Sequence, residues 1–514
     1  MNKLFEKPNV LLLYPKTGLD FGSTVAPPHS LLAVAAPLHS YGYKVKILDQ
    51  RVKNISDHDL RNCISPELLC IGISCMTGSQ VRYAIGLAAR IRSLSNGEVP
   101  IAWGGTHPTV TPQQTIMHPD VDIIIVGEGE ESFLELIQAL ESKKGLRHIK
   151  GILFKEGKEV RTTGERSLLD VETLLPTPWE LIDVEKYIHV DMYVKGRTRV
   201  MDLGQTSRGC PFKCGFCSSA TIRKRRWRPM SVEKSLALII ENVERFKLDG
   251  FWLRDDEFYI DGKRAHEICL GMIRHGLDVS FYTSGTRVDV FSKATDEQLR
   301  VLRKAGAHTL KFGAESGSQR ILDLMSKGIK VEQTLEANRR CKKFGFQPAF
   351  ALMIGYPTET FEDIDKTIDL AFTLKKENPQ AQIETMATYT ALPGTPSFGF
   401  AIQHGLKPPQ SLEGWADWIF DDYDFQGDRI PWFNKRDRIA VGNIAYMSIL
   451  SNAIVNIVGS IRNPILRTVS VALSRIGSIY FSWRLRTKRY RFVPEAAIVR
   501  ILRRKFFYNK KQSS

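Results

Sequence analysis

Three cysteines stand in one short loop with the spacing C-x3-C-x2-C, at Cys210, Cys214 and Cys217 in TSRGCPFKCGFCSS. Thiolates are soft ligands that suit iron–sulfur clusters or zinc. Structural zinc usually takes four ligands, often as two separated pairs, and no fourth cysteine lies close in this sequence. A 4Fe–4S cluster also normally takes four ligands, so three cysteines would leave one iron open to a cofactor or substrate. The spacing therefore indicates a cluster with an open iron, and the alternatives are a zinc loop or buried core thiols.

The other five cysteines are predicted to be packing residues. Cys70 and Cys75 lie five residues apart on one strand-like run, so their side chains point to opposite faces of a sheet and cannot share a metal. Cys63, Cys269 and Cys341 lie in helical patterns, where small buried thiols are common. The scatter of the cysteines is not that of a secreted disulfide framework.

A fold must position the cysteine loop, and 514 residues are too many for one compact core. The hydrophobic share of 43% and the charged share of 25% are ordinary, so most of the chain should be ordered. Five apolar runs separated by helical stretches come first, at 9–15, 44–49, 68–75, 100–105 and 122–127. They predict an α/β domain with a flavodoxin-like, doubly wound parallel sheet, which binds ligands beyond the carboxyl ends of its strands.

A second alternating series predicts a partial or complete parallel barrel of the TIM type. Its candidate strands are 199–205, 251–255, 279–284, 308–313, 348–355 and 383–389. The cysteine loop follows the first of them, at the strand end where such barrels carry their active sites. We therefore divide the chain into a Rossmann-like domain, a linker, a barrel and a helical C-terminal region with a basic tail, at 1–150, 151–195, 196–400 and 401–514.

The cysteine loop, including Phe216 just before its last cysteine, resembles the motif of the radical S-adenosylmethionine (SAM) superfamily. The resemblance implies that Cys210, Cys214 and Cys217 hold a 4Fe–4S cluster whose open iron binds the amino and carboxylate groups of SAM. It also implies that an electron from the cluster splits SAM into methionine and a 5′-deoxyadenosyl radical. An external electron donor, such as flavodoxin or ferredoxin, is implied as a partner.

Segments after the later barrel strands resemble the SAM-binding parts of this superfamily. In FWLRDDEFYID, Asp256 and Glu257 would receive the SAM ammonium, with a helix cap or a surface acid as the alternative. In KFGAESGSQR, Glu315 and Ser316 would lie near the SAM ribose or carboxylate, with a helix-capping role as the alternative. Arg287, in SGTRVD, would meet the carboxylate or form a surface salt bridge.

The segment ALMIGYPTET matches the glycine–proline turn after the fifth barrel strand, and the resemblance places Gly355 near adenine. Thr358 departs from the pattern, because the family often has glycine there. The departure bears on the loop shape and not on the assignment.

The first domain does not carry a dinucleotide fingerprint. The turn after its first strand, YPKTGLDFG, does not fit G-x-G-x-x-G, and VGEGEES is acidic and lacks the third glycine. The domain instead resembles the cobalamin-binding half of cobalamin-dependent radical SAM proteins in PPHSLLAVAAPLHSYGYKVKILD, WGGTHPTVTPQQT and DVDIIIVGEGEESFLEL. With the barrel, the resemblance covers about residues 1–400.

The resemblance implies cobalamin as a further cofactor, although the motif D-x-H-x-x-G, which gives histidine to cobalt, is absent. The residues expected to face cobalamin are Thr77, Gly78, Gly104, Gly105, Thr106 and His107. His107 would hydrogen-bond the corrin edge or be a satisfied structural histidine. The alternative for the whole domain is a sheet that binds nothing.

The C-terminus carries most of the excess charge. The formal net charge is +16, and residues 484–511 hold eleven Lys or Arg and one acid, which is +10 of that total. In EAAIVRILRRKFFY, an apolar stripe of Ile498, Val499, Leu502 and Phe506 lies beside basic residues, so the tail would contact an acidic membrane surface or pack on the barrel. Nucleic acid is not expected as a partner, because no binding motif accompanies the charge. Without a signal-peptide or spanning pattern, we expect a cytoplasmic protein, peripheral to the inner face of the membrane if the tail binds there.

Taken with the resemblance, these features predict a cobalamin-dependent radical SAM methyltransferase that acts on an unactivated carbon through a 5′-deoxyadenosyl radical and methylcobalamin. A radical SAM oxidative cyclase or C–C bond-forming enzyme, similar to the anaerobic magnesium-protoporphyrin monomethyl ester cyclases, is the alternative. A non-catalytic cobalamin-sensing or scaffold protein is a third possibility, from another class. The substrate would be a small molecule: a lipid, an isoprenoid, a tetrapyrrole or a soluble precursor.

Overall fold

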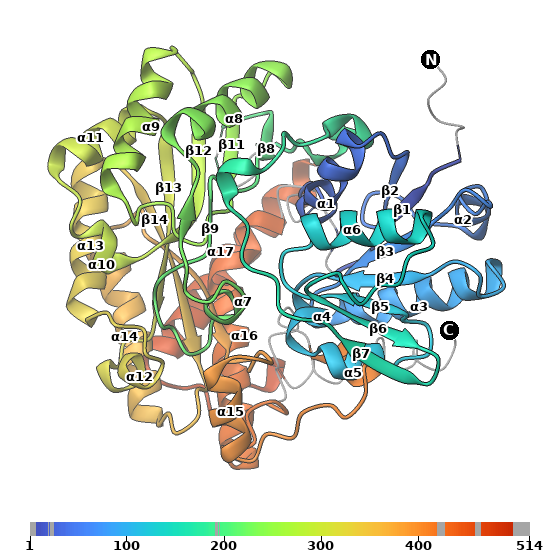
Figure 1. Ribbon diagram of the computed structural model, residues 1–514. Helices are drawn as coiled ribbons and strands as arrows, with labels where there is room; N and C mark the ends of the chain where they lie inside the picture. The colour runs from blue at the N-terminus through green and yellow to red at the C-terminus, as the bar shows by residue number, and fades with distance from the viewer. Residues whose placement is uncertain are drawn as a thin grey trace.

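The computed structural model describes residues 7–18, 20, 25–190, 194, 196–418, 427–457 and 464–496. Two α/β lobes lie next to each other, and the C-terminal helices run behind and between them (Figure 1). The blue and cyan lobe is the first domain, and the green and yellow lobe is the barrel.

The first domain is built on the predicted flavodoxin-like sheet. Its five parallel strands are β1 (Val10–Tyr14), β2 (Val45–Asp49), β3 (Cys70–Ser74), β4 (Ile101–Gly104) and β5 (Ile123–Ile125), in the order β2-β1-β3-β4-β5. This order confirms the predicted doubly wound fold and places a topological switch point between β1 and β3. Helices α1 (His29–Ser40) and α6 (Glu130–Glu141) pack together on one face, and α3 (Ser79–Leu94) covers the other.

An antiparallel hairpin extends this sheet beyond the predicted five strands. It consists of β6 (Ile152–Glu156), which pairs with β5, and β7 (Glu159–Thr162). Ile152, Leu153 and Phe154 are buried, so they cover the apolar edge that β5 would otherwise expose. The region expected to be a linker from residue 151 therefore begins as part of the sheet. Short 3-10 helices follow it: η2 (Val171–Thr173), η3 (Trp179–Leu181) and η4 (Val184–Tyr187).

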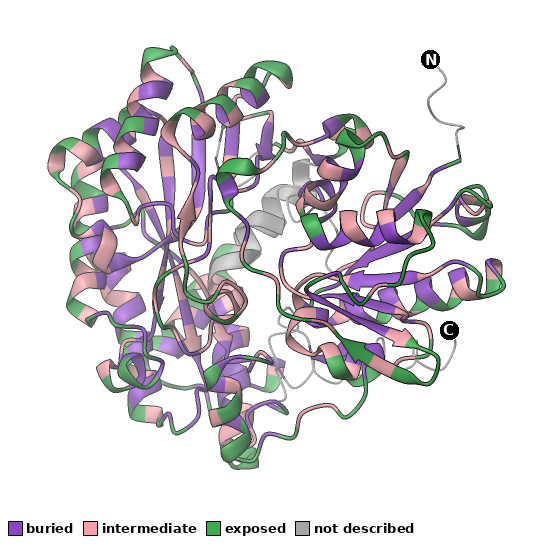
Figure 2. Cartoon of the chain, in the orientation of Figure 1, coloured by how far each residue is buried: buried purple, intermediate pink, exposed green. Residues whose placement is uncertain are grey.

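The second lobe is a partial barrel of six parallel strands. They are β8 (Val200–Asp202), β11 (Gly250–Leu253), β12 (Ser280–Thr286), β13 (Ala307–Glu315), β14 (Gln347–Ile354) and β15 (Gln382–Thr388), and each pairs with the next in chain order. Helices alternate with them: α8 (Val232–Arg245), α9 (Gly262–Arg274), α11 (Asp296–Lys304), α13 (Val331–Phe344) and α14 (Phe361–Glu377). Figure 2 shows buried strands inside and exposed helix faces outside.

The core confirms the prediction for the five remaining cysteines. Cys70 packs with Leu12 on the α1 side of the first sheet, and Cys75 packs with Leu13 on the α3 side. Together with Cys63, Cys269 and Cys341 they are buried free thiols. None of these five therefore competes with the cysteine loop for a metal.

The C-terminal region adds α15 (Pro396–Gln403), α16 (Lys435–Ile457) and α17 (Pro464–Arg486). Helix α16 packs beside β15, where Ser448 Oγ accepts a 3.0 Å hydrogen bond from the Met386 backbone N–H. The amphipathic stripe expected at 498–506 lies outside the described residues. Among the residues that are described, we find no helix long and apolar enough to cross a membrane.

Candidate functional site

The three-cysteine loop lies between β9 (Ser207–Arg208) and the short helix α7 (Ser218–Ile222). It begins at Gly209, whose φ of +86° suits glycine, and a Cβ there would meet the Arg226 carbonyl oxygen. The Gly209 N–H donates to Asp256 Oδ2 at 2.9 Å, and the Gly215 N–H donates to the Met325 carbonyl at 2.8 Å. The segments that follow β11 and helix α12 (Gln319–Leu324) therefore fix both halves of the loop.

Cys210, Cys214 and Cys217 are free thiols and partly exposed, so they are accessible to a cluster. Burial raises the pKa of Cys210 to about 12, so metal binding there would release a proton. The described residues contain no group of three His, Cys, Asp or Glu side chains arranged round a single metal ion. Thiols that each bind a different iron of one cluster need not converge on a point. The loop thus fits a three-cysteine cluster.

Arg287 lies against this loop. Its Nη1 donates to Cys214 Sγ at 3.3 Å, its Nη2 donates to the Lys327 carbonyl at 2.7 Å, and its guanidinium stacks on Phe212 at 3.7 Å. Its ion pair with Asp289, 2.9 Å long, is buried and not on the surface. A cation held here can offset the negative charge of bound thiolates.

The acidic residues after β11 serve the loop and the barrel rim. Asp256 accepts the Gly209 hydrogen bond described above. Glu257 is buried and accepts backbone hydrogen bonds from Tyr259 and Arg287 at 3.1 and 2.7 Å, and its burial raises its pKa to about 8. Asp255 was not predicted from the sequence. It accepts hydrogen bonds from the Thr206 backbone N–H and from the Thr206 hydroxyl, the second at 3.0 Å. The roles proposed for Asp256 and Glu257 toward SAM stay predictions.

Glu315 forms a buried ion pair with a lysine that sequence reasoning missed. Lys327 Nζ lies 2.7 Å from Glu315 Oε1, and both side chains are at most 12% exposed. A Cβ on Gly313 would lie 2.5 Å from Glu315 Oε1 and 2.7 Å from Lys327 Nζ, so glycine makes room for the pair. Glu315 has a φ of +61°, which is strained for a residue with a side chain. Such strain at the rim of a barrel is typical of a ligand-binding position.

Ser316 is fully buried, and its Oγ lies 3.1 Å from Thr367 Oγ1 and accepts from the Ser318 N–H. Gly355 ends β14 with a φ of +85°. Its N–H donates to Glu359 Oε2 at 2.5 Å, and its carbonyl accepts from Trp432 Nε1 at 3.1 Å. Ser316 thus holds the α14 side of the rim, and Glu359 holds the turn that the resemblance places near adenine.

Glu359 should make stability depend on pH. Burial raises its pKa from 4.5 to about 8, only partly offset by backbone hydrogen bonds from Tyr356 and Gly355, and its Oε1 has no hydrogen-bond partner. Because the folded pKa is raised, the contribution of Glu359 to stability is greatest below about pH 4.5 and is lost as pH rises towards 8. Glu359→Gln should remove about 2–4 kcal/mol of this loss in the free energy of unfolding. Chemical denaturation at pH values from about 5 to 8.5 measures the change. Exposed Glu362→Gln is the control, and equal pH slopes in all three proteins would contradict the assignment.

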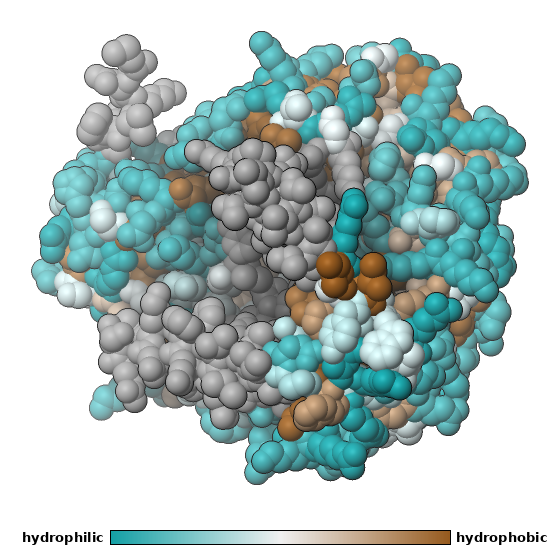
Figure 3. Space-filling model, turned by 180° about the vertical axis from the view of Figure 1, so that it is seen from behind, coloured by the Kyte–Doolittle hydropathy of each residue, from teal (hydrophilic) through white to brown (hydrophobic). Residues whose placement is uncertain are grey.

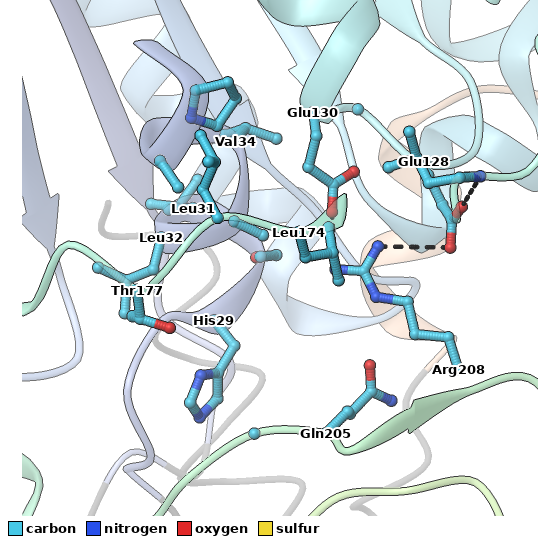
Figure 4. Close-up of a pocket in the computed structure, with 18 of the residues that line it drawn as sticks. His29, Leu31, Leu32, Val34, Glu128, Glu130, Leu174, Thr177, Gln205 and Arg208 are labelled. Atoms are coloured by element: carbon cyan, nitrogen blue, oxygen red, sulfur yellow. Dashed lines mark hydrogen bonds and ion pairs between the residues drawn. The ribbon is translucent and has the colours of Figure 1, made fainter. Parts of the chain in front are cut away.

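A cavity of about 1390 Å³ lies between the two lobes. It exceeds the roughly 300–1,000 Å³ of ordinary small-ligand pockets, so it suits a large cofactor. From the first domain, the loop after β4 contributes Gly104, Gly105 and Thr106, and from the barrel, Gln205 and Arg208 lie just before the cysteine loop. Figure 4 shows Leu31, Leu32 and Val34 of α1 on one side of this space and Arg208 on another. Small residues at the strand ends leave the sheet accessible, which fits cobalamin.

The other three residues expected to face cobalamin are set back from the cavity. Thr77 and Gly78 do not line the cavity, and neither does His107. The His107 ring is fully buried, with Nδ1 3.0 Å from Thr77 Oγ1 and Nε2 3.2 Å from Thr111 Oγ1. Desolvation lowers its pKa to about 4. Both of its ring nitrogens are therefore engaged by protein, which matches the structural alternative stated for it.

A different histidine lines the cavity and was not found from the sequence. His29 begins α1, and its Nε2 lies 3.1 Å from Oδ1 of the fully buried Asp202 in β8. Arg254 pairs with the other oxygen of Asp202. Burial alone would raise the pKa of Asp202, but Arg254 and His29 hold it below its usual value. The imidazole is thereby held at the junction of the lobes (Figure 4). The only sequence signal was a histidine directly before the helix in PPHSLL.

One glutamate in the cavity wall holds three arginines. Glu128 accepts from Arg228 Nη2 at 2.7 Å and also pairs with Arg208 and Arg223, while Glu130 pairs with Arg208 at 2.7 Å. Figure 4 shows Glu128, Glu130 and Arg208 together at one end of the cavity. The acidic loop VGEGEES thus ties the first domain to both flanks of the cysteine loop.

Replacing Gly105 should weaken retention of a cofactor in this cavity. Gly105 has a φ of +98°, and a Cβ would lie 2.8 Å from the Cys75 carbonyl oxygen. Gly105→Ala should therefore displace the loop after β4 and lower cobalamin affinity about tenfold or more. Cobalt per chain after gel filtration measures the effect. The control is Gly86→Ala on α3, where a Cβ meets nothing within 4 Å. Equal cobalt in the two variants would contradict this role for the loop.

A doubly wound domain, a partial barrel and a three-cysteine loop, whose flanking residues line the cavity between the lobes, define a class of enzyme with two cofactor sites, one for cobalamin and one for a SAM-bound cluster. Comparison with known families agrees: residues 205–371 match the radical SAM superfamily and residues 23–137 match the B12 binding domain. The chain belongs to the radical SAM superfamily, in the group that carries an N-terminal B12-binding domain. The cofactors of this group are a 4Fe–4S cluster, SAM and cobalamin.

Two relatives and one solved structure illustrate the similarity. An uncharacterized methyltransferase, PH0819, of Pyrococcus horikoshii is 32% identical over 405 residues, covering 77% of this chain and 84% of that protein. The anaerobic magnesium-protoporphyrin IX monomethyl ester cyclase of Rubrivivax gelatinosus is 27% identical, covering 76% and 68%. The cobalamin-dependent radical SAM enzyme OxsB, with aqua-cobalamin and SAM bound, superposes with a TM-score of 0.74 at 20% identity, covering 98% and 76%. The last of these supports the fold.

Proposed function

We propose that this protein is a cobalamin-dependent radical SAM methyltransferase that methylates an unactivated carbon of a small molecule. One observation carries the proposal: a single cavity is lined both by the loop after β4 of the B12-binding domain and by Gln205 and Arg208, which lead into the cysteine loop. Two reactive centres held at one junction between the lobes can act on the same carbon in turn. The name of the Pyrococcus horikoshii relative, a methyltransferase, supports the same class.

When bound, the cluster and SAM supply a radical that removes hydrogen from carbon, and cobalamin supplies the methyl group. The chain's own residues supply the setting. Cys210, Cys214 and Cys217 would hold the cluster, and Arg287 keeps a positive charge beside Cys214. Gly105 lets the loop after β4, which lines the cavity, pack closely against the Cys75 backbone.

The second candidate is a radical SAM oxidative cyclase, and the similarity to a magnesium-protoporphyrin cyclase favours it. Such an enzyme would use the same cluster loop and would also form 5′-deoxyadenosine. It would not need to consume the methyl group of SAM. The two candidates therefore differ in the sulfur-containing product, even before a substrate is known.

The test is to purify the full chain anaerobically with added hydroxocobalamin, count iron, sulfide and cobalt, and incubate it with SAM and a chemical reductant or a flavodoxin system. About four irons and one cobalt per chain are expected, with both 5′-deoxyadenosine and S-adenosylhomocysteine as products. S-adenosylhomocysteine reports transfer of the SAM methyl group. A matched preparation without hydroxocobalamin should form 5′-deoxyadenosine alone.

Formation of 5′-deoxyadenosine alone in the cobalamin-loaded protein would favour the cyclase candidate. Loss of cobalt with retention of iron would overturn the methyltransferase and leave a radical SAM enzyme. With candidate substrates, a product heavier by one methylene group identifies methylation, whereas cyclisation removes hydrogen or adds oxygen. A lipid, an isoprenoid and a tetrapyrrole are the first classes to try.

A further inference from the structure

In residues 475–486 of helix α17, apolar side chains lie on two sides, and the described part of the chain covers one of them. Phe481 and Leu485 are buried, and the Phe481 ring meets Tyr446 of α16 edge-on at 6.1 Å. On another side, Ile476 and Ile479 are 65% and 71% exposed. A helix that only packs against its own protein needs one apolar stripe, so the second one requires another partner.

The exposed side continues into a compact surface, which we call the α17 surface. Its members are Ile476, Ile479, Tyr480, Trp483 and Phe492, which are 42–78% exposed. The first four follow the spacing i, i+3, i+4, i+7, so they form one stripe along the helix. In the view from behind, brown and pale side chains gather near the middle of a largely hydrophilic face (Figure 3).

Exposed arginines lie beside the α17 surface. Arg475, Arg486 and Arg489 are exposed, and the Arg489 guanidinium lies 4.9 Å from the Trp483 ring. The acids nearby are already paired in the described structure. Glu495 pairs with a buried arginine at 3.1 Å, and Asp437, Asp365 and Asp369 pair with Arg491 or Lys488 at 2.7–3.5 Å.

We propose that the α17 surface binds the anionic face of a lipid bilayer, with its isoleucines and aromatic rings in the interface and its arginines on lipid phosphates. Aliphatic and aromatic residues on one stripe with arginine beside them are the composition of interfacial helices. Tryptophan and tyrosine have apolar rings and polar edges, which suits the headgroup level. With a net charge of +16, the protein is attracted to an anionic bilayer surface. This inference goes beyond the proposed reaction and does not depend on it.

The experiment is sedimentation of the full chain with vesicles of phosphatidylcholine alone and of phosphatidylcholine with phosphatidylglycerol. We expect binding to the anionic vesicles that weakens at high salt, and little binding to the neutral ones. The double variant Ile476→Ser/Ile479→Ser should bind about tenfold more weakly, because it removes two buried aliphatic side chains from the interface. Arg475→Gln/Arg486→Gln should lower binding to anionic vesicles only.

The matched control is Met117→Ser/Ile402→Ser, which removes two exposed apolar side chains, 70% and 41% exposed, away from the α17 surface. It should bind like the unchanged protein. Absence of vesicle binding, or equal binding to neutral and anionic vesicles, would overturn the proposal. Binding that the isoleucine variant leaves unchanged would assign the contact to another part of the chain and overturn it equally. A lower oligomeric mass of that variant without lipid would show that a second copy covers the α17 surface instead.

Discussion

Cys214→Ala is expected to abolish SAM cleavage. With two thiolates left in the loop, a 4Fe–4S cluster has too few protein ligands, so iron and sulfide after anaerobic reconstitution should fall close to background. Formation of 5′-deoxyadenosine should fall by about a thousandfold or more, because the electron that splits SAM comes from the cluster. Cys214 is the most informative of the three, since Arg287 Nη1 also contacts it at 3.3 Å.

The control for this experiment is Cys269→Ala. Cys269 is 1% exposed in the barrel core, so its replacement removes a packed sulfur and no ligand. It should cost about 1 kcal/mol of stability and leave the iron content and SAM cleavage unchanged. A Cys214→Ala protein that keeps four irons and cleaves SAM would contradict the assignment of the loop.

Glu128→Gln is expected to loosen the contact between the two lobes. The Glu128 side chain is 4% exposed and compensates Arg208, Arg223 and Arg228. Removing one partner of a buried ion pair leaves the others uncompensated, so the free energy of unfolding should fall by about 3 kcal/mol. Chemical denaturation measures the loss, and limited proteolysis should cut residues 163–178 faster.

The control is Glu131→Gln, three residues further along the chain, in α6. Glu131 is 54% exposed and pairs with Arg166 at 2.8 Å, so its loss should cost below about 1 kcal/mol. The effect of Glu128→Gln should also depend on pH. Burial alone would raise the pKa of Glu128, but Arg228, Arg223 and Arg208 lower it from 4.5 to about 2. Its contribution is therefore complete above about pH 4.5 and is lost as pH falls towards 2. A constant difference across this range would contradict the charge mechanism.

Local patterns in the sequence predicted most of the fold. Apolar runs at 308–313 and 348–355 lie within β13 and β14, because a parallel strand buried on both faces must be apolar. The β6–β7 hairpin was missed, because it follows five strand–helix units and because β7, with the sequence EVRT, is mostly exposed and has no apolar run. Its only local signal is the turn at Gly157, which has a φ of +62°.

The part of the candidate site whose residues lie close together in the sequence, the cysteine loop, was predictable. The pairs that join the lobes were not predictable, because their partners are far apart in the chain. His29 and Asp202 are 173 residues apart, and Glu128 and Arg228 are 100 apart. The loop VGEGEES was considered as a phosphate-binding motif, for which its charge is wrong, and as part of the segment that resembles cobalamin-binding domains. Its role became visible only with the three arginines that face it.

The cavity between the lobes has a consequence for the supply of cofactor. Its walls come from α1, α6 and the loop after β4 on one side and from residues 203–208 and α8 on the other, so the complete cavity exists only when the lobes are docked. A molecule that fills it therefore binds the docked form and not the separated one, and occupancy and docking strengthen each other by mass action. When cobalamin is scarce, the docked form would lose this stabilisation, and the protein would be more open to proteolysis.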